Sequence, residues 1–257
     1  MYSIKNKVVF ITGASEGIGK ACAYAFAEQG ARLILSARRI NILNEIADDL
    51  RKKHGVKVYA YKLDVRNREE VEVGITHLPD EWKKIDILVN NAGLGRGLEK
   101  MYLDNPDSWE EMIDTNIKGL LYVTRMIAPQ MAERKEGHII NIGSIAGHEA
   151  YPKGGVYCAT KFAVNAITKS LKMDLIDKNI RVSSIDPGAV ETEFSNIRFY
   201  GDKERAKQVY KGFKPLTAED IADAVLYCAT RPPHVNIGEI ILTPTAQASA
   251  FVLHREE

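Results

Sequence analysis

Cysteine is scarce in this sequence, and so is net charge. Only three cysteines occur in 257 residues, Cys22, Cys158 and Cys228, and they are odd in number and widely spaced. Such a set excludes a disulfide framework and a zinc ligand cluster, and it indicates the reducing environment of the cytoplasm. The 35 basic and 34 acidic residues leave a net charge of +1. This balance excludes the strongly basic surface that nucleic acids bind, so we expect no nucleic-acid partner.

Long hydrophobic runs and metal-ligand patterns are also missing. The apolar run Val8–Ile11 is too short to span a membrane, and the polar residues 1–7 before it do not predict a secretory signal. The six histidines lack a ligand spacing such as H-x-x-x-H. We therefore expect no membrane partner and no metal site, and a small molecule as the ligand.

Apolar, β-branched segments alternate with amphipathic segments along the whole chain. This alternation predicts one domain over residues 1–257, an α/β fold with a doubly wound, Rossmann-type parallel sheet of about seven strands and helices on both faces. Strands are expected at 7–11, 31–36, 56–62, 85–89, 138–142, 181–185 and 237–242. Helices are expected at 20–29, 40–53, 68–78, 107–131, from just before Tyr157 to 178, and at 217–230.

Three local features add detail to this assignment. Thr217 is expected to be the N-cap of the last helix, with Asp220 at its third position. Pro129 should kink or end the helix at 107–131, because proline lacks the amide proton that a helix interior needs. The polar, irregularly amphipathic stretch 193–214 is predicted to be a mobile lid.

A glycine-rich turn follows the first strand and leads into a helix. It reads Thr12-Gly-Ala-Ser-Glu-Gly-Ile-Gly19, with the spacing G-x-x-x-G-x-G. A turn between strand and helix can place backbone N–H groups and a helix N-terminus against a pyrophosphate, although a tight structural connection is the alternative. The placement favours dinucleotide binding, with the contacts supplied by Gly13, Ser15, Glu16, Gly17, Ile18 and Gly19.

The second strand ends without the carboxylate that commonly binds the ribose 2′-hydroxyl of NAD. The sequence there is Ser36-Ala37-Arg38-Arg39. Because a guanidinium matches a phosphate, Arg38 with support from Arg39 indicates the 2′-phosphate of NADP. A solvated arginine pair is the alternative, and Glu16 counts against a nearby phosphate because like charges repel.

Tyr157 and Lys161 are four residues apart, so a helix places them on one face. An ammonium one turn away should lower the tyrosine pKa and make the phenol usable for proton transfer. A half-buried tyrosine with a lysine extending past it is the alternative. Ligands of a doubly wound sheet bind at the carboxyl ends of its strands, where the chain places the glycine turn, Arg38, Asp64, Asn91, Ser144 and Pro187-Gly188.

These motifs, in this order, resemble the short-chain dehydrogenases/reductases of the classical type. The resemblance is carried by the glycine turn, Asn90-Asn-Ala-Gly93, Asn116, Ser144, Tyr157-x-x-x-Lys161 and Pro187-Gly188. It implies a nicotinamide cofactor, hydride transfer and a homotetramer. The segments 141–144, 193–199 and 234–237 further resemble NADP-dependent 3-hydroxy acid dehydrogenases, which act on serine, allo-threonine and similar acids.

The resemblance also implies a role for each matching residue. Tyr157 is the general acid or base, Lys161 lowers its pKa and binds the nicotinamide ribose, and Ser144 donates to the substrate oxygen. Asn116 would bend its helix and hold a water, whereas an exposed helix face is its alternative. The cofactor contacts implied are the phosphate turn, Asp64 and Val65 at the adenine, Asn91 and Gly93 at the ribose, and Pro187, Gly188, Val190 and Thr192 at the nicotinamide.

The substrate side is the least determined part of the sequence. A carboxylate substrate needs a cation, and Arg198 or Arg96 could provide it, although each could equally be a surface or interface arginine. His148 and Glu149 are expected to line the pocket beyond Ser144. A broader NADPH-dependent reductase of carbonyls or secondary alcohols is an alternative function. A non-catalytic NADP(H)-binding sensor is another, though it would not need the Asn, Ser, Tyr and Lys set.

Overall fold

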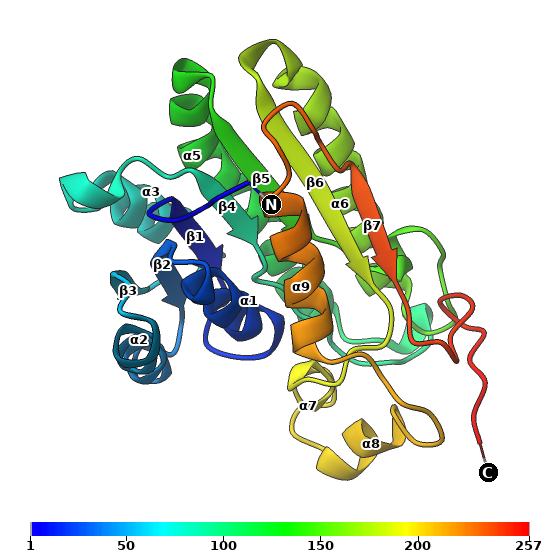
Figure 1. Ribbon diagram of the computed structural model, residues 1–257. Coiled ribbons are helices and arrows are strands. Elements are labelled where there is room, and N and C mark those ends of the chain that lie inside the picture. The colour runs from blue at the N-terminus through cyan, green and yellow to red at the C-terminus, as the bar shows by residue number, and fades with distance from the viewer. Residues whose placement is uncertain (1, 257) are drawn as a thin grey trace.

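The computed structural model describes residues 2–256 and contains a seven-stranded parallel sheet in the order β3-β2-β1-β4-β5-β6-β7 (Figure 1). This confirms the predicted fold class. The strands are β1 Val8–Thr12, β2 Arg32–Ala37, β3 Val58–Lys62, β4 Ile87–Asn90, β5 Gly137–Ile142, β6 Ile180–Pro187 and β7 Glu239–Leu242. All residues of β1 and β4 are buried, as expected for central strands covered on both faces.

Helices cover both faces of the sheet (Figure 1). On one face α1, α2 and α9 pack against the strands, and on the other α3, α5 and α6 do so. The helices are α1 Gly17–Glu28, α2 Ile40–His54, α3 Arg68–Thr76, α4 Pro106–Ile113, α5 Leu120–Arg134, α6 Gly155–Asp174, α7 Phe194–Arg198, α8 Lys203–Gln208 and α9 Ala218–Ala229. Among the described residues, no helix combines the length and apolar character needed to cross a membrane.

The long helix predicted at 107–131 differs from its expectation. It consists of α4, a π-helical turn over Asp114–Gly119, and α5. Pro129 lies inside α5, which continues to Arg134, so the expectation that this proline could end the helix is wrong. The irregularity falls instead at the π-helical turn, where the extra residue re-aims the side chains that follow.

The predicted cap of the last helix is confirmed. Thr217 and Asp220 form a complete capping box at the start of α9, as their spacing indicated. The predicted lid forms two short helices, α7 and α8, and three of its side chains, Ser195, Phe199 and Ala206, are buried. The lid is therefore packed against the rest of the protein, at the edge of the sheet where the strands end.

Candidate active site

The carboxyl ends of the strands and the segment 193–214 line a cavity of about 640 Å³. This volume lies within the range of small-molecule and cofactor sites. Most residues predicted from the sequence line it, and together they form one continuous wall: Gly13, Ser15, Glu16, Gly17, Ile18, Arg38, Arg39, Asp64, Val65, Asn91, Gly93, Ser144, Tyr157, Lys161, Pro187, Gly188, Val190, Thr192 and Arg198. Five predicted residues, Gly19, Arg96, Asn116, His148 and Glu149, are not part of that wall.

The glycine turn is held by close backbone packing. Gly13 has a φ of +66°, and a Cβ there would lie 2.9 Å from the Ala92 Cα atom. A Cβ on Gly19 would lie 2.4 Å from the Asn91 Nδ2 atom, which donates to the carbonyl oxygens of Thr12 and Gly13 at 2.9 and 3.1 Å. Gly19 thus permits Asn91 to brace the turn, and its contact with the phosphates stays a prediction.

The two arginines after β2 lie in different surroundings. Arg39 pairs with Glu16 at 2.7 Å and donates to the Ser15 hydroxyl at 2.9 Å. Arg38 is exposed on the cavity wall and makes no ion pair or hydrogen bond with another side chain among residues 2–256. Because Arg39 neutralises the Glu16 carboxylate, the objection to a phosphate beside Arg38 is removed. The turn, the α1 N-terminus and a free guanidinium therefore fit a dinucleotide with a 2′-phosphate.

Asp64 and Val65 line the cavity next to the arginines, where an adenine was expected. Two oxygens of the Asp64 carboxylate accept hydrogen bonds from the Arg66 side chain, the shortest at 2.6 Å. Burial by itself would raise the Asp64 pKa, but the Arg66 guanidinium outweighs it and the pKa is lowered. Asp64 is therefore a charged, fixed wall residue.

Tyr157 and Lys161 lie in the first turns of α6 and face the cavity together. The Lys161 Nζ atom donates to the Ile142 carbonyl oxygen at 3.0 Å and lies 5.9 Å from the centre of the Tyr157 ring. Ser144 follows β5, and its hydroxyl accepts a hydrogen bond from the Ala146 amide at 3.1 Å. Phe194 from the lid packs edge-on against the Tyr157 ring at 5.6 Å. An alcohol or carbonyl oxygen near Tyr157 would thus meet two hydroxyl groups in a pocket with an apolar wall.

The electrostatics of this pair differ from the expectation. Burial raises the pKa of Tyr157, while the Ser144 hydroxyl and the Arg198 guanidinium act to lower it. Burial also lowers the pKa of Lys161 to about 8, although the Asp186 carboxylate opposes this. With protein groups alone, the pKa of Tyr157 lies above its ordinary value and not below it as expected, because burial of the phenol has the largest effect on it.

Asn116 is buried in the π-helical turn and reaches the back of the site. Its Nδ2 atom donates to the Leu94 carbonyl at 2.9 Å and to the Thr160 hydroxyl at 3.0 Å, and its Oδ1 atom accepts from the Leu94 amide at 2.9 Å. A Cβ on Gly93 would lie 3.3 Å from Asn116 Oδ1 and 3.7 Å from Lys161 Nζ. The alternative of an exposed helix face is therefore wrong, and only a glycine separates this amide from the lysine.

The two arginines proposed for a substrate carboxylate lie in different surroundings. Arg96 is outside the cavity wall and is paired with both carboxylate oxygens of Glu111, at 2.6 and 3.1 Å. Arg198 lies on the wall, 5.3 Å from the centre of the Tyr157 ring, and donates to the Tyr151 hydroxyl and the Gly97 carbonyl, both at 2.9 Å. Within residues 2–256 it has no carboxylate partner. Of these two arginines, Arg198 is therefore the one available to an acidic ligand.

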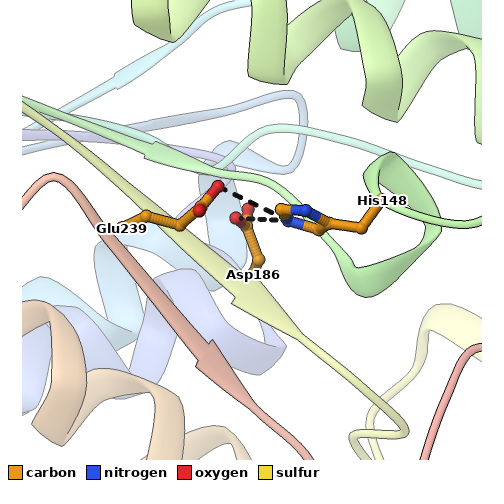
Figure 2. Close-up of side chains that lie close together, drawn as sticks. All are labelled: His148, Asp186 and Glu239. Atoms are coloured by element: carbon orange, nitrogen blue, oxygen red, sulfur yellow. Dashed lines mark hydrogen bonds and ion pairs between the residues drawn. The ribbon is translucent and has the colours of Figure 1, made fainter.

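His148 and Glu149 are the clearest errors among the predicted substrate contacts. Figure 2 shows the His148 imidazole directed at two carboxylates, with its Nε2 atom 2.9 Å from Asp186 and 3.5 Å from Glu239. Glu149 accepts a hydrogen bond from the Ala250 amide at 3.1 Å. The 3₁₀ turn Ile145–Gly147 after Ser144 carries both residues away from the cavity.

The same cluster bears on the expectation of no metal site. One potential ligand atom from each of His148, Asp186 and Glu239 lies within 4.8 Å of the others, a grouping that no sequence spacing indicated. Both oxygens of Asp186 are already hydrogen-bonded, one to the Ser184 hydroxyl at 2.6 Å and one to His148. The cluster is thus a satisfied hydrogen-bond network as it stands.

Comparison with known proteins agrees with this geometry. The profile of the short chain dehydrogenase family matches residues 7–200. The chain belongs to the short-chain dehydrogenase family. A curated NADP-dependent 3-hydroxy acid dehydrogenase from Schizosaccharomyces pombe is 43% identical over 258 residues, covering 100% of both chains. A sulfoacetaldehyde reductase from Chromohalobacter salexigens is 41% identical, covering 98% of this chain and 100% of the relative.

A solved structure extends the likeness to the fold. The closed form of a serine dehydrogenase complexed with NADP⁺ superposes with a TM-score of 0.89 and 44% sequence identity. The match covers 97% of this chain and 100% of that chain. The sheet, the crossover helices and the lid region of this short-chain dehydrogenase therefore have a full-length counterpart.

The sequence did not predict that the C-terminal tail of this short-chain dehydrogenase contributes to the cavity wall. Gln247 accepts a hydrogen bond from the Ala189 amide at 2.8 Å and so braces the segment after Pro187-Gly188. Leu253 and Arg255 line the cavity, and Arg255 also donates to backbone carbonyls of Val209 and Lys211 in the lid. The tail carries no motif and no periodic apolar pattern, so nothing in the sequence pointed to it.

Proposed function

We propose that this chain is an oxidoreductase that transfers a hydride between NADP(H) and the 3-hydroxyl or 3-oxo carbon of a small 3-hydroxy acid such as serine or allo-threonine. The observation that carries the proposal is Arg198, a cation on the cavity wall beside Tyr157 whose hydrogen-bond partners are all neutral. A guanidinium in that position suits the carboxylate of an acid whose hydroxyl reaches the tyrosine. The names of the relatives point in the same direction.

Each of the chain's active-site residues would have a separate role in the reaction. Tyr157 exchanges a proton with the substrate oxygen, and Ser144 donates a hydrogen bond to that oxygen as charge develops on it. The raised pKa keeps Tyr157 protonated near neutral pH, which suits the general acid of carbonyl reduction. Lys161 would bind the nicotinamide ribose, and Asn116 would hold a water behind it. When bound, the nicotinamide supplies or accepts the hydride.

The cofactor preference rests on the arginine pair. Arg38 would bind the 2′-phosphate of NADP, while Arg39 keeps Glu16 neutralised. A spectrophotometric panel tests the proposal as a whole. It compares NADP with NAD, using serine, allo-threonine, 3-hydroxyisobutyrate and a neutral secondary alcohol. Turnover of the acids with NADP is expected, and a strong preference for NAD or for the neutral alcohol would refute it.

A broader NADPH-dependent carbonyl reductase is the second candidate. The relative named sulfoacetaldehyde reductase supports it, because a sulfonate is also an anion that Arg198 could bind. Adding sulfoacetaldehyde and a neutral ketone to the panel separates the two functions. A non-catalytic NADP(H) sensor has less support, since it needs neither Ser144 nor Tyr157.

Assembly and location complete the proposal. We propose a homotetramer, because large apolar side chains are exposed along the faces of α4, α5 and α6, namely Ile113, Leu121, Phe162 and Met173. Burying this face between copies would remove the apolar surface from water. A cytoplasmic location is supported by three unpaired, buried cysteines. The chain would work as one domain, with residues 193–214 as its lid.

A further inference from the structure

A buried carboxylate lies directly behind the active-site wall. Asp186 is the residue before Pro187 in β6, and it is 1% exposed. Its Oδ1 atom accepts from the Ser184 hydroxyl at 2.6 Å, and its Oδ2 atom lies 2.9 Å from His148 Nε2 (Figure 2). These two contacts fix the orientation of the carboxylate. The proposed reaction gives it no role.

Asp186 and Lys161 approach the same short backbone segment. Lys161 donates to the carbonyl oxygen of Ile142 at 3.0 Å. At the next residue, Gly143, a Cβ would lie only 1.8 Å from Asp186 Oδ1, so the carboxylate packs against the glycine Cα atom. The Gly143 amide donates to the Ile185 carbonyl at 2.8 Å, which locks this segment to β6. Gly143, which has no side chain, is therefore all that separates the Asp186 carboxylate from the Ile142 carbonyl that binds the Lys161 ammonium.

The charges around Lys161 are few. Tyr157 faces it from its own helix, Asp186 faces it from β6, and the π-helical turn contributes only the neutral Asn116. Asp186 in turn faces His148 and Glu239, the latter on β7. Burial lowers the pKa of Lys161 to about 8, and the carboxylate of Asp186 is the group that opposes the loss of its proton.

We infer that Asp186 is a positioning residue that keeps the Lys161 amine protonated across the Ile142–Gly143 segment, and that Ser184 and His148 hold its carboxylate in place for this purpose. The buried Lys161 ammonium has no direct carboxylate partner among residues 2–256. The more distant charge of Asp186 therefore offsets the effect of burial on the protonation of Lys161. This inference concerns the protein alone and can be tested without cofactor or substrate.

The test measures the Lys161 pKa directly. Only a neutral amine reacts with an acylating reagent, so the pH dependence of labelling, followed for the Lys161 peptide by mass spectrometry, gives the midpoint of its titration. For the unaltered protein we expect a midpoint near pH 8. In Asp186→Asn, which keeps the shape and removes the charge while one accepting oxygen becomes a donating NH2 group, the midpoint should fall by about one pH unit or more. An unchanged midpoint would overturn the inference.

Two further variants make the result specific. Glu239→Gln removes one carboxylate from the same cluster, but Glu239 contacts the imidazole and not Gly143, so the Lys161 midpoint should stay where it is. Equal shifts in both variants would also overturn the inference, because they would reflect the whole network. If Asp186→Asn does not fold, Asp186→Ser is smaller and equally neutral, and the same fall is expected. In the active enzyme, the alkaline limb of kcat should move to lower pH in Asp186→Asn, whereas a merely structural role lowers kcat equally at every pH.

Discussion

Replacing Arg198 by methionine separates binding of a substrate carboxylate from catalysis. Methionine keeps an unbranched apolar side chain, and it removes the guanidinium, whose central carbon lies 5.7 Å from the centre of the Tyr151 ring and 5.3 Å from that of Tyr157. The guanidinium now has only neutral partners, the Tyr151 hydroxyl and the Gly97 carbonyl. An acid in the cavity would therefore make the one charge-assisted contact available to this side chain.

The size of the effect follows from that contact. A hydrogen bond between charged groups contributes about 1.5–3 kcal/mol, which corresponds to about 10- to 150-fold in binding. The substitution also removes a charge that lowers the Tyr157 pKa, so kcat should fall for every substrate. The informative quantity is the ratio of kcat/KM for serine to kcat/KM for a neutral secondary alcohol, measured with NADP. This ratio should fall by about 10-fold or more.

A second lid arginine provides the control. Arg205 pairs with Glu99 at 3.4 Å and lies outside the cavity wall, so Arg205→Met should leave the ratio unchanged. If Arg198→Met reduces both activities by the same factor, Arg198 does not bind the carboxylate, and its role is limited to the lid and to Tyr157.

Three other substitutions test separate parts of the structure. Arg38→Ser should raise KM for NADP by about 10- to 100-fold with little change for NAD, and parallel changes for both cofactors would remove the 2′-phosphate role. Tyr157→Phe should abolish measurable turnover of every accepted alcohol while the thermal midpoint stays within a few degrees; unchanged turnover would refute its role as acid or base. Thr217→Ala should cost about 1 kcal/mol of unfolding free energy, because it removes the capping box of α9. That loss is measurable by denaturant titration, and no loss would mean that the fold tolerates the uncapped end.

The parts of the site that follow strands were predictable from the sequence. A buried parallel strand is recognisable as a short β-branched run, and its carboxyl end must fall at one edge of the sheet with those of its neighbours. Arg38, Asp64 and Ser144 are therefore brought to one cavity by topology alone. The same reasoning fails where the backbone turns within a few residues. His148 lies four residues after Ser144, yet after a single 3₁₀ turn its side chain pairs with Asp186 in β6 and does not line the cavity.

Contacts between segments far apart in the chain were beyond prediction for a different reason. The sequence offered both Arg198 and Arg96 as candidates, and the choice depends on Glu111, which neutralises Arg96 from α4. No pattern in one sequence reports such a partner. The same holds for Gln247 and Arg255, which reach the cavity from a tail without regular structure.

The Tyr157–Lys161 pair shows that correct placement of two side chains does not determine their pKa values. Their spacing does put both side chains on one face of α6, and both line the cavity. Attraction between a phenolate and an ammonium would lower one pKa and raise the other, but burial acts oppositely on both groups and prevails. The charges that act against burial come from elsewhere, from Arg198 for the tyrosine and from Asp186 in β6 for the lysine. A residue pair that the sequence identifies at once depends on two residues that only the fold brings near.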